Sequence, residues 1–97
     1  MALFDLKMTM ERICDIYDTA FAEKQIKFTL NVTASITFII NDESRISQVL
    51  INLLNNAIKF TGFNGSIEVA LEDSDNMMRI SVYNNGAAIP IKRLNHI

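Results

Sequence analysis

The chain has 97 residues, of which 49% are hydrophobic and 21% charged, and its formal net charge at pH 7 is −2. This length suits one domain and excludes two independent ones, and the composition excludes intrinsic disorder. The slightly acidic balance argues against a nucleic-acid partner. The single cysteine excludes an internal disulfide and favours a cytoplasmic location, and no apolar run approaches the ~20 residues that span a bilayer.

The first third of the chain predicts one helix followed by two strands. Apolar residues recur at spacings of three and four over Asp5–Glu23, which is the pattern of an amphipathic helix. Asp5 is the expected N-cap, since its carboxylate can accept a backbone N–H of the first turn. Apolar and polar residues then alternate over Ile26–Val32, which predicts a half-buried strand. Ile36–Ile40 is a shorter β-branched run and predicts a second strand.

The second long helix is predicted to begin after Asp42 and to end near Thr61 and Gly62. Asp42 is the expected N-cap, and Glu43 lies favourably at the positive end of the helix dipole. The apolar stripe of this helix consists of Ile46, Val49, Leu50, Leu53, Leu54, Ala57 and Ile58. Glycine ends the helix readily because it adopts the left-handed conformation that follows many helices.

The last third predicts two more strands, Ser66–Leu71 and Met77–Tyr83, and then a loop over 84–90. Residues 91–97 could begin a further helix. This order of elements predicts an α+β two-layer sandwich, with helices on one face of a mixed, mainly antiparallel sheet.

Candidate binding residues lie on the polar side of the second long helix. At ~100° per residue, Asn52, Asn56 and Lys59 form one stripe beside the apolar face. An amide oxygen is a hard neutral ligand that suits Mg²⁺, and a lysine one turn further can meet a phosphate. The alternative is an ordinary solvated polar face, and these residue types alone leave both interpretations open.

The segment from Asp42 to Thr61 resembles the N-box of the histidine-kinase-type ATPases. These ATPases belong to the gyrase, chaperone, kinase and mismatch-repair group with the Bergerat fold. The N-box pattern is D-x-x-R-[IL]-x-Q-[IV]-L-x-N-L-L-x-N-A-x-K-[FY]-T, and the segment meets it throughout. The other predicted elements follow the family order, so the resemblance covers residues 1–97 as a single domain. It covers only the first part of such a domain, a truncated Bergerat fold without the ATP lid, the second glycine-rich box and the C-terminal strands.

The resemblance implies ATP and Mg²⁺ as cofactors. The asparagine that matches Asn56 coordinates the Mg²⁺ on the nucleotide phosphates, and the lysine that matches Lys59 approaches those phosphates. Asn52 stands where the gyrase-type enzymes carry a glutamate that activates water. An amide cannot act as a general base, so Asn52 agrees with the kinase branch, which transfers phosphate to a protein histidine. No residue of this chain is assigned as catalytic.

The G1 box of the family, D-x-G-x-G, corresponds to residues 84–88. In the family its aspartate accepts the adenine amino proton, and its glycines let the backbone close around the nucleotide. Here Asn84 replaces the aspartate and accepts more weakly, Gly86 is retained, and Ala88 adds a methyl group where the family has none. The G1 box is therefore degenerate, and the alternative interpretation is an ordinary turn after a strand.

These observations predict an ATP-binding domain of a sensor histidine kinase in two-component signalling that does not transfer phosphate by itself. The resemblance implies a separate domain with the phospho-acceptor histidine as a partner, and His96 is expected to be a surface residue. The alternative is a degenerate, non-catalytic relative that acts as a protein-interaction or dimerisation module. Whether this chain is an enzyme stays open.

Self-association is also expected, on the basis of the predicted sheet. The family sheet has further strands beyond Met77–Tyr83, and without them this strand would expose an unpaired edge. An unpaired strand edge is a template for pairing with another chain. We therefore predict a homo-oligomer that forms through this edge.

Overall fold

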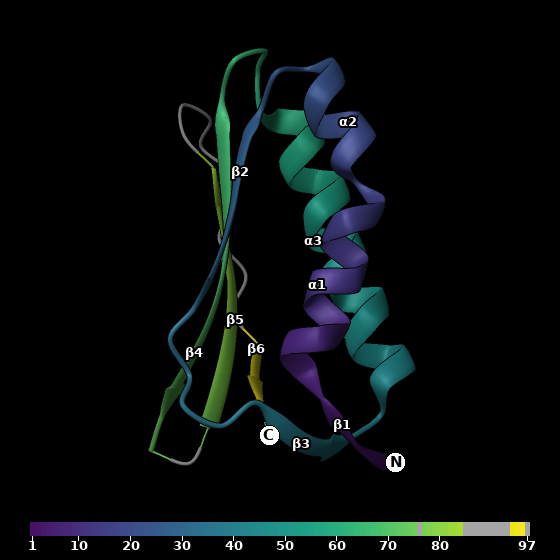
Figure 1. Ribbon diagram of the computed structural model, residues 1–97, viewed down its shortest axis with the longest axis vertical. Helices are drawn as coiled ribbons and strands as arrows, with labels where there is room; N and C mark the ends of the chain where they lie inside the picture. Colours follow the sequence, from purple (N-terminus) through teal and green to yellow (C-terminus); the bar gives the residue numbers. More distant parts are fainter. Residues whose placement is uncertain (76, 85–93, 97) are drawn as a thin grey trace.

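The computed structural model describes residues 1–75, 77–84 and 94–96. Its helices cover one face of a four-stranded sheet, and a two-stranded sheet lies at one end of the molecule (Figure 1). In chain order the elements are β1 (Ala2–Asp5), α1 (Leu6–Ile16), α2 (Asp18–Glu23), β2 (Lys27–Val32), β3 (Phe38–Asn41), α3 (Glu43–Phe60), β4 (Ser66–Ser74), β5 (Met77–Asn84) and β6 (Leu94–His96). The predicted two-layer α+β sandwich is confirmed.

The single helix predicted over residues 5–23 is wrong, because two helices occupy this segment. Asp5 does cap α1, and its side chain accepts from the Lys7 backbone N–H at 3.0 Å. The break falls at Tyr17, whose backbone N–H donates to the Cys14 carbonyl at 3.0 Å in a tighter turn than the α-helix. After the break, Phe21 of α2 makes a stacked contact with Phe28 of β2, at 4.7 Å between ring centroids.

The N-terminal strand β1 was not predicted, and the strand predicted over 36–40 is shifted to β3. These two strands pair with each other, antiparallel, with Leu3 opposite Ile40 and Phe4 opposite Ile39. Ile39 is buried in the core and Phe4 packs against it, whereas Leu3 and Ile40 are exposed. Four residues carry too short a pattern for the sequence to identify β1, since its strand geometry depends on a partner far along the chain.

The main sheet has the strand order β2-β4-β5-β6. Strands β2 and β4 are parallel, with Lys27 opposite Ser66, and the β4–β5 and β5–β6 pairs are antiparallel. The mixed, mainly antiparallel sheet is thus confirmed, although β4 runs to Ser74, further than predicted.

The end of the described chain corrects two predictions. Residues 94–96 form β6 rather than the start of a helix. Strand β6 pairs with Met78, Arg79 and Ile80, so the edge predicted to be unpaired along 77–83 is covered at those residues. Among the described strands the edges of the main sheet are β2 and β6.

The hydrophobic core lies between the helices and the sheet. Met10, Leu50, Leu54, Val69 and Leu71 have no exposed surface. Full burial of such a side chain contributes about 1.5–3 kcal/mol each. Ile67, Val69 and Leu71 of β4 and Ile80 and Val82 of β5 belong to the same buried cluster as Leu50 and Leu54 of α3, as the alternation in the sequence predicts.

The start of α3 is fixed by two neighbouring carboxylates. Asp42 is the N-cap, as predicted, and accepts from the Arg45 backbone N–H at 3.3 Å. Glu43 accepts from Thr9 Oγ1 at 2.6 Å and from Arg12 Nη2 at 3.1 Å, both on α1. These hydrogen bonds, with that from Thr9 the stronger, hold the pKa of Glu43 below its ordinary value. Glu43 therefore joins α1 to α3. Its carboxylate also interacts favourably with the positive end of the α3 helix dipole.

Candidate functional site

The stripe predicted on α3 is exposed. Asn52, Asn56 and Lys59 all face solvent. Gln48 Nε2 donates to Asn52 Oδ1 at 3.4 Å, which leaves Asn52 partly occupied within its own helix. The amide of Asn56 and the ammonium of Lys59 make no hydrogen bond to any described residue, and Lys59 Nζ lies 5.5 Å from the centroid of the Phe60 ring. Asn56 and Lys59 are thus available to a ligand on this side of α3.

Asn55 has a different role from its neighbour. Its Oδ1 accepts from Tyr17 Oη at 2.8 Å, so Asn55 ties α3 to the junction between α1 and α2. Burial raises the pKa of Tyr17, which keeps the phenol protonated as the donor. Both asparagines are exposed, but Asn55 is engaged with Tyr17 whereas Asn56 has no hydrogen-bond partner among the described residues.

Thr61, just after α3, is held through its backbone by Ala57 and Lys24. Its backbone N–H donates to the Ala57 carbonyl at 2.9 Å. Lys24 Nζ donates to the carbonyls of Ile58 at 2.8 Å and Thr61 at 3.0 Å. An ammonium at this position also interacts favourably with the negative end of the helix dipole. The Thr61 residue is 1% exposed, so its hydroxyl has a defined position at the end of the helix.

Asn84 meets Thr61 at the end of β5. Its backbone position is set by pairing opposite Ile67 of β4, and its Nδ2 donates to Thr61 Oγ1 at 3.2 Å. This bond joins the end of the N-box helix to the start of the predicted G1 box. Thr61 was not among the predicted site residues, although it is the last position of the N-box pattern, which was the available signal.

Two further predicted residues, Gly86 and Ala88, lie outside the described residues. Of the remaining residues, the structure brings Asn84 together with Thr61, whereas the contact described for Lys59 is with the Phe60 ring.

The donor set constrains the metal that the site could hold. The described residues contain no cluster of three or more His, Cys, Asp or Glu side chains that could hold a metal ion by themselves. A cation beside α3 would be held by a neutral amide oxygen together with oxygens that its ligand supplies. The exposed and unpartnered Asn56 amide fits Mg²⁺ bound in that way, because Mg²⁺ prefers oxygen ligands and is commonly shared with phosphates.

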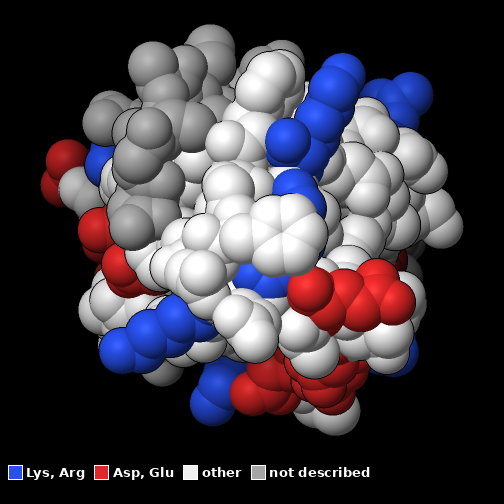
Figure 2. All heavy atoms as spheres, turned by 90° about the horizontal axis from the view of Figure 1, so that it is seen from above, with Lys and Arg blue, Asp and Glu red and all other residues white. Residues whose placement is uncertain are grey.

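The surface around the end of α3 carries both signs of charge. Figure 2 looks onto this end of the molecule and shows basic and acidic side chains interspersed with uncharged surface, with basic atoms also at its centre. Positive and negative charges are mixed on the described part of this face. It therefore does not form the basic stripe that is typical of nucleic-acid binding.

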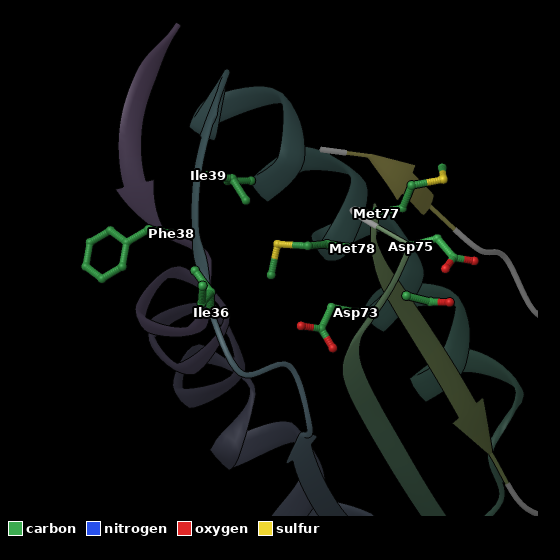
Figure 3. Close-up of a pocket in the computed structure, with 8 residues that line it drawn as sticks. Ile36, Phe38, Ile39, Asp73, Asp75, Met77 and Met78 are labelled. Carbon is green, nitrogen blue, oxygen red and sulfur yellow. The ribbon is translucent and has the colours of Figure 1, made fainter.

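A hollow lies at the opposite end of the β4–β5 hairpin. Its volume is about 470 Å³, and Figure 3 shows Ile36, Phe38 and Ile39 on one side of it and Asp73, Asp75, Met77 and Met78 on the other. Asp73 Oδ2 already accepts from the backbone N–H and the hydroxyl of Ser35. None of the described candidate residues, which are Asn52, Asn56, Lys59 and Asn84, lines this hollow.

One family of known proteins matches the C-terminal part of this chain. Residues 41–97 match the family described as histidine kinase-, DNA gyrase B-, and HSP90-like ATPase. This chain belongs to that ATPase family. The matched segment runs from the residue before the cap of α3 through the Thr61–Asn84 contact, so it includes all the candidate residues of the site. The resemblance stated from the N-box is confirmed.

Sensory kinases are among the relatives of this family member. The adaptive-response sensory kinase SasA of Synechocystis sp. is 34% identical over 91 residues, which are 93% of this chain and 23% of that protein. SasA of Rippkaea orientalis is 31% identical over 93 residues, 95% of this chain and 24% of that protein. The chain thus spans about a quarter of the length of these curated relatives.

Solved structures of histidine kinases are also similar to this chain. The catalytic domain of histidine kinase ThkA has a TM-score of 0.85 at 34% identity, covering 92% of this chain and 61% of that one. ThkA in complex with the response regulator TrrA has a TM-score of 0.84 at 34% identity, covering 92% and 27%. Full-length ShkA in complex with AMPPNP has a TM-score of 0.76 at 28% identity, covering 84% of this chain and 18% of that one.

Within the described residues, none of the helices combines the length and apolarity needed to cross a membrane.

Proposed function

We propose that this chain is the nucleotide-binding part of a cytoplasmic sensor histidine kinase of a two-component system. The supporting observation is the hydrogen bond of 3.2 Å between Asn84 and Thr61, which joins the N-box helix to the start of the G1 box. The contact supports the proposal because it joins Asn84, which we propose faces the base, to the residue that follows α3. Asn56 and Lys59, which we propose face the phosphates, have no hydrogen-bond partner among the described residues.

Each residue has one proposed task in binding Mg-ATP or Mg-ADP. The Asn56 amide oxygen holds the Mg²⁺, which neutralises phosphate charge when it is bound. Lys59 approaches the phosphates as a point charge, and Asn84 faces the base. Gly86 and Ala88 complete the loop around the nucleotide in this proposal. The Asn84 amide is a weaker acceptor than a carboxylate, so the nucleotide affinity is weak.

The isolated chain neither hydrolyses ATP efficiently nor transfers phosphate. Asn52 carries an amide where a water-activating base would have to stand, and an amide does not take up a proton at neutral pH. The partner in phosphotransfer is a separate domain with the phospho-acceptor histidine. A response regulator is a further partner by analogy with ThkA, which is described in complex with one.

Calorimetric titration with Mg-ADP tests this function. We expect weak, Mg²⁺-dependent binding that Asn56→Ala reduces by at least about tenfold, since one good metal ligand is lost. The matched control is Asn55→Ala, which makes the same change one residue away but removes only the bond to Tyr17. Unchanged affinity in Asn56→Ala would remove the site assignment, and equal losses in the two variants would indicate a general effect on the helix.

A second candidate function is favoured by the exposed face of the β1–β3 sheet. Leu3, Phe38 and Ile40 lie on one face of this ribbon and are 66%, 57% and 65% exposed. Contiguous apolar side chains of this kind favour association. We propose that this face, rather than the β5 edge, supports self-association of a non-catalytic interaction module.

Sedimentation equilibrium at micromolar concentration tests self-association. We expect a species larger than 11 kDa that Ile40→Thr shifts toward the monomer. Ile16→Thr, on an exposed residue of α1, is the control and leaves the distribution unchanged. A monomer at all concentrations would contradict this second function without affecting the first.

A further inference from the structure

Asn84 differs chemically from the aspartate of the G1 pattern in having two unlike ends. A side-chain amide has an acceptor oxygen and a donor nitrogen, whereas an ionised carboxylate has acceptors only. In the structure Nδ2 donates to Thr61 Oγ1 at 3.2 Å, and Oδ1 has no hydrogen-bond partner among the described residues. Asn84 is half-buried, so its side chain keeps some solvent-accessible surface while one end of the amide is engaged with Thr61.

The Thr61 hydroxyl can form a hydrogen bond with either orientation of this amide. A threonine hydroxyl both accepts and donates, so it pairs with Nδ2 as an acceptor or with Oδ1 as a donor. The movement of the hydroxyl is restricted, because Thr61 is 1% exposed and its backbone is held by Ala57 and by Lys24. The Asn84 backbone is likewise held by the β4–β5 ladder. A 180° turn of the amide group therefore keeps the Thr61–Asn84 bond and exchanges the group that is presented to a ligand.

The two orientations match two classes of purine. With Nδ2 on Thr61, Oδ1 is presented and accepts from a 6-amino group. With Oδ1 on Thr61, Nδ2 is presented and donates to a 6-oxo group. We propose that this site binds 6-oxopurine nucleotides as well as 6-aminopurine nucleotides, with Thr61 as the positioning residue that supports both orientations of Asn84. This inference rests on the proposed nucleotide-binding function.

Calorimetric titrations with Mg-ADP and Mg-IDP test the inference. The two nucleotides share their ribose and phosphates, and their bases differ at position 6 and in the proton on N1. For the unmodified chain we expect dissociation constants within about fivefold of each other, since either base keeps its hydrogen bond. For Asn84→Asp we expect Mg-ADP to be preferred by at least about tenfold, because a carboxylate facing a 6-oxo group opposes two acceptors.

Variants at Thr61 test its positioning role. Thr61→Val removes the hydroxyl at nearly constant shape and is expected to weaken both nucleotides by about threefold or more, since the amide is no longer held. Thr61→Ser keeps the hydroxyl and is expected to retain both affinities. Thr29→Val, on the exposed side of β2, is the control and changes neither.

The outcomes separate the inference from the function on which it rests. If the unmodified chain binds Mg-ADP but binds Mg-IDP more than about tenfold more weakly, the inference is overturned and the proposed function stands. Binding of neither nucleotide overturns both. An unchanged preference in Asn84→Asp shows that residue 84 does not contact position 6 of the base, and this also overturns the inference. Wild-type affinities in Thr61→Val overturn the role of Thr61.

Discussion

The two ends of α3 use their polar residues differently. At the start of the helix, Asp42 and Glu43 are both engaged, with the Arg45 backbone N–H and with two side chains of α1. At the far end, the helix itself is closed by Lys24, but Asn56 and Lys59 are left without hydrogen-bond partners among the described residues. One end of the helix is thus committed to stability, and the other keeps polar groups available to a ligand.

This contrast indicates where changes should affect stability alone and where they should also affect binding. A charged group that is already bonded within the fold contributes to stability but offers little to a ligand. An exposed amide or ammonium without a partner contributes little to the fold and is available for recognition. The variants below are chosen at the middle of α3, at its C-terminal end and at its start.

The largest effect is expected in the middle of the helix, where both ends depend on the same packing. Leu54 has no exposed surface, and Leu54→Ala should lower the free energy of unfolding by about 2–5 kcal/mol. Chemical denaturation measures this loss. Ile16→Ala, on a residue that is 70% exposed, is the control and should change the free energy of unfolding by no more than about 0.5 kcal/mol.

The thiol of Cys14 provides an independent measurement on the same variant. Burial, with a smaller effect from Asp15 and Asp18, raises the pKa of Cys14 to about 12. The native thiol should therefore stay protonated and react slowly with a disulfide reagent at neutral pH. Leu54→Ala should accelerate the reaction, and a thiol that reacts equally fast in both proteins would contradict the burial of Cys14 in the native core.

An intermediate effect is expected at the C-terminal end. Lys24→Met keeps the aliphatic stem but leaves the carbonyls of Ile58 and Thr61 without their ammonium donor, at a cost of about 1–2 kcal/mol. Nucleotide affinity should fall as well, because Thr61 loses one of its anchors. The matched control is Asp42→Ala, which removes the N-cap at the other end and costs about 0.5–2 kcal/mol. Equal losses of nucleotide affinity in the two variants would contradict the proposed division between the ends of α3.

The smallest effect is expected in the pH dependence of the start of α3. The folded pKa of Glu43 is lowered from the ordinary value of 4.5 by the hydrogen bonds from Thr9 and Arg12. Its contribution to stability is therefore fully present above the unfolded pKa and is lost as pH falls through the folded pKa. Glu43→Gln should flatten the decline in stability on the acid side of pH 4.5, measured by urea denaturation at several pH values. Glu11→Gln, on an exposed residue of the same helix pair, should retain the original profile, and an identical profile in Glu43→Gln would refute the linkage.

The sequence predicted α3 and its polar stripe well because their signals are local. The N-cap Asp42, the apolar period and the polar residues one turn apart all lie within a single segment, and each acts over a few residues. The alternation over β4 and β5 is local in the same sense. The helix break at Tyr17 was missed because neither glycine nor proline marks it in the sequence.

The prediction for the sheet edge shows the opposite case. The strand over 77–83 was identified correctly, but its neighbours could not be read from its own residues. Pairing of Met78–Ile80 with β6 depends on a segment that the sequence suggested as a helix. A strand's hydrogen-bonding groups are satisfied by other segments, so the edges of a sheet are properties of the assembled fold.

By itself the sequence determined the family, the core faces of α3, β4 and β5, and the candidate residues Asn56, Lys59 and Asn84. Only the tertiary structure decided that β1 pairs with β3, that β2 lies parallel to β4, and that Thr61 holds Asn84. The physical reason is the range of the interactions. Caps and periodicity act between residues a few positions apart, whereas Thr61 and Asn84 are 23 positions apart in the chain and meet only when α3 packs on the sheet.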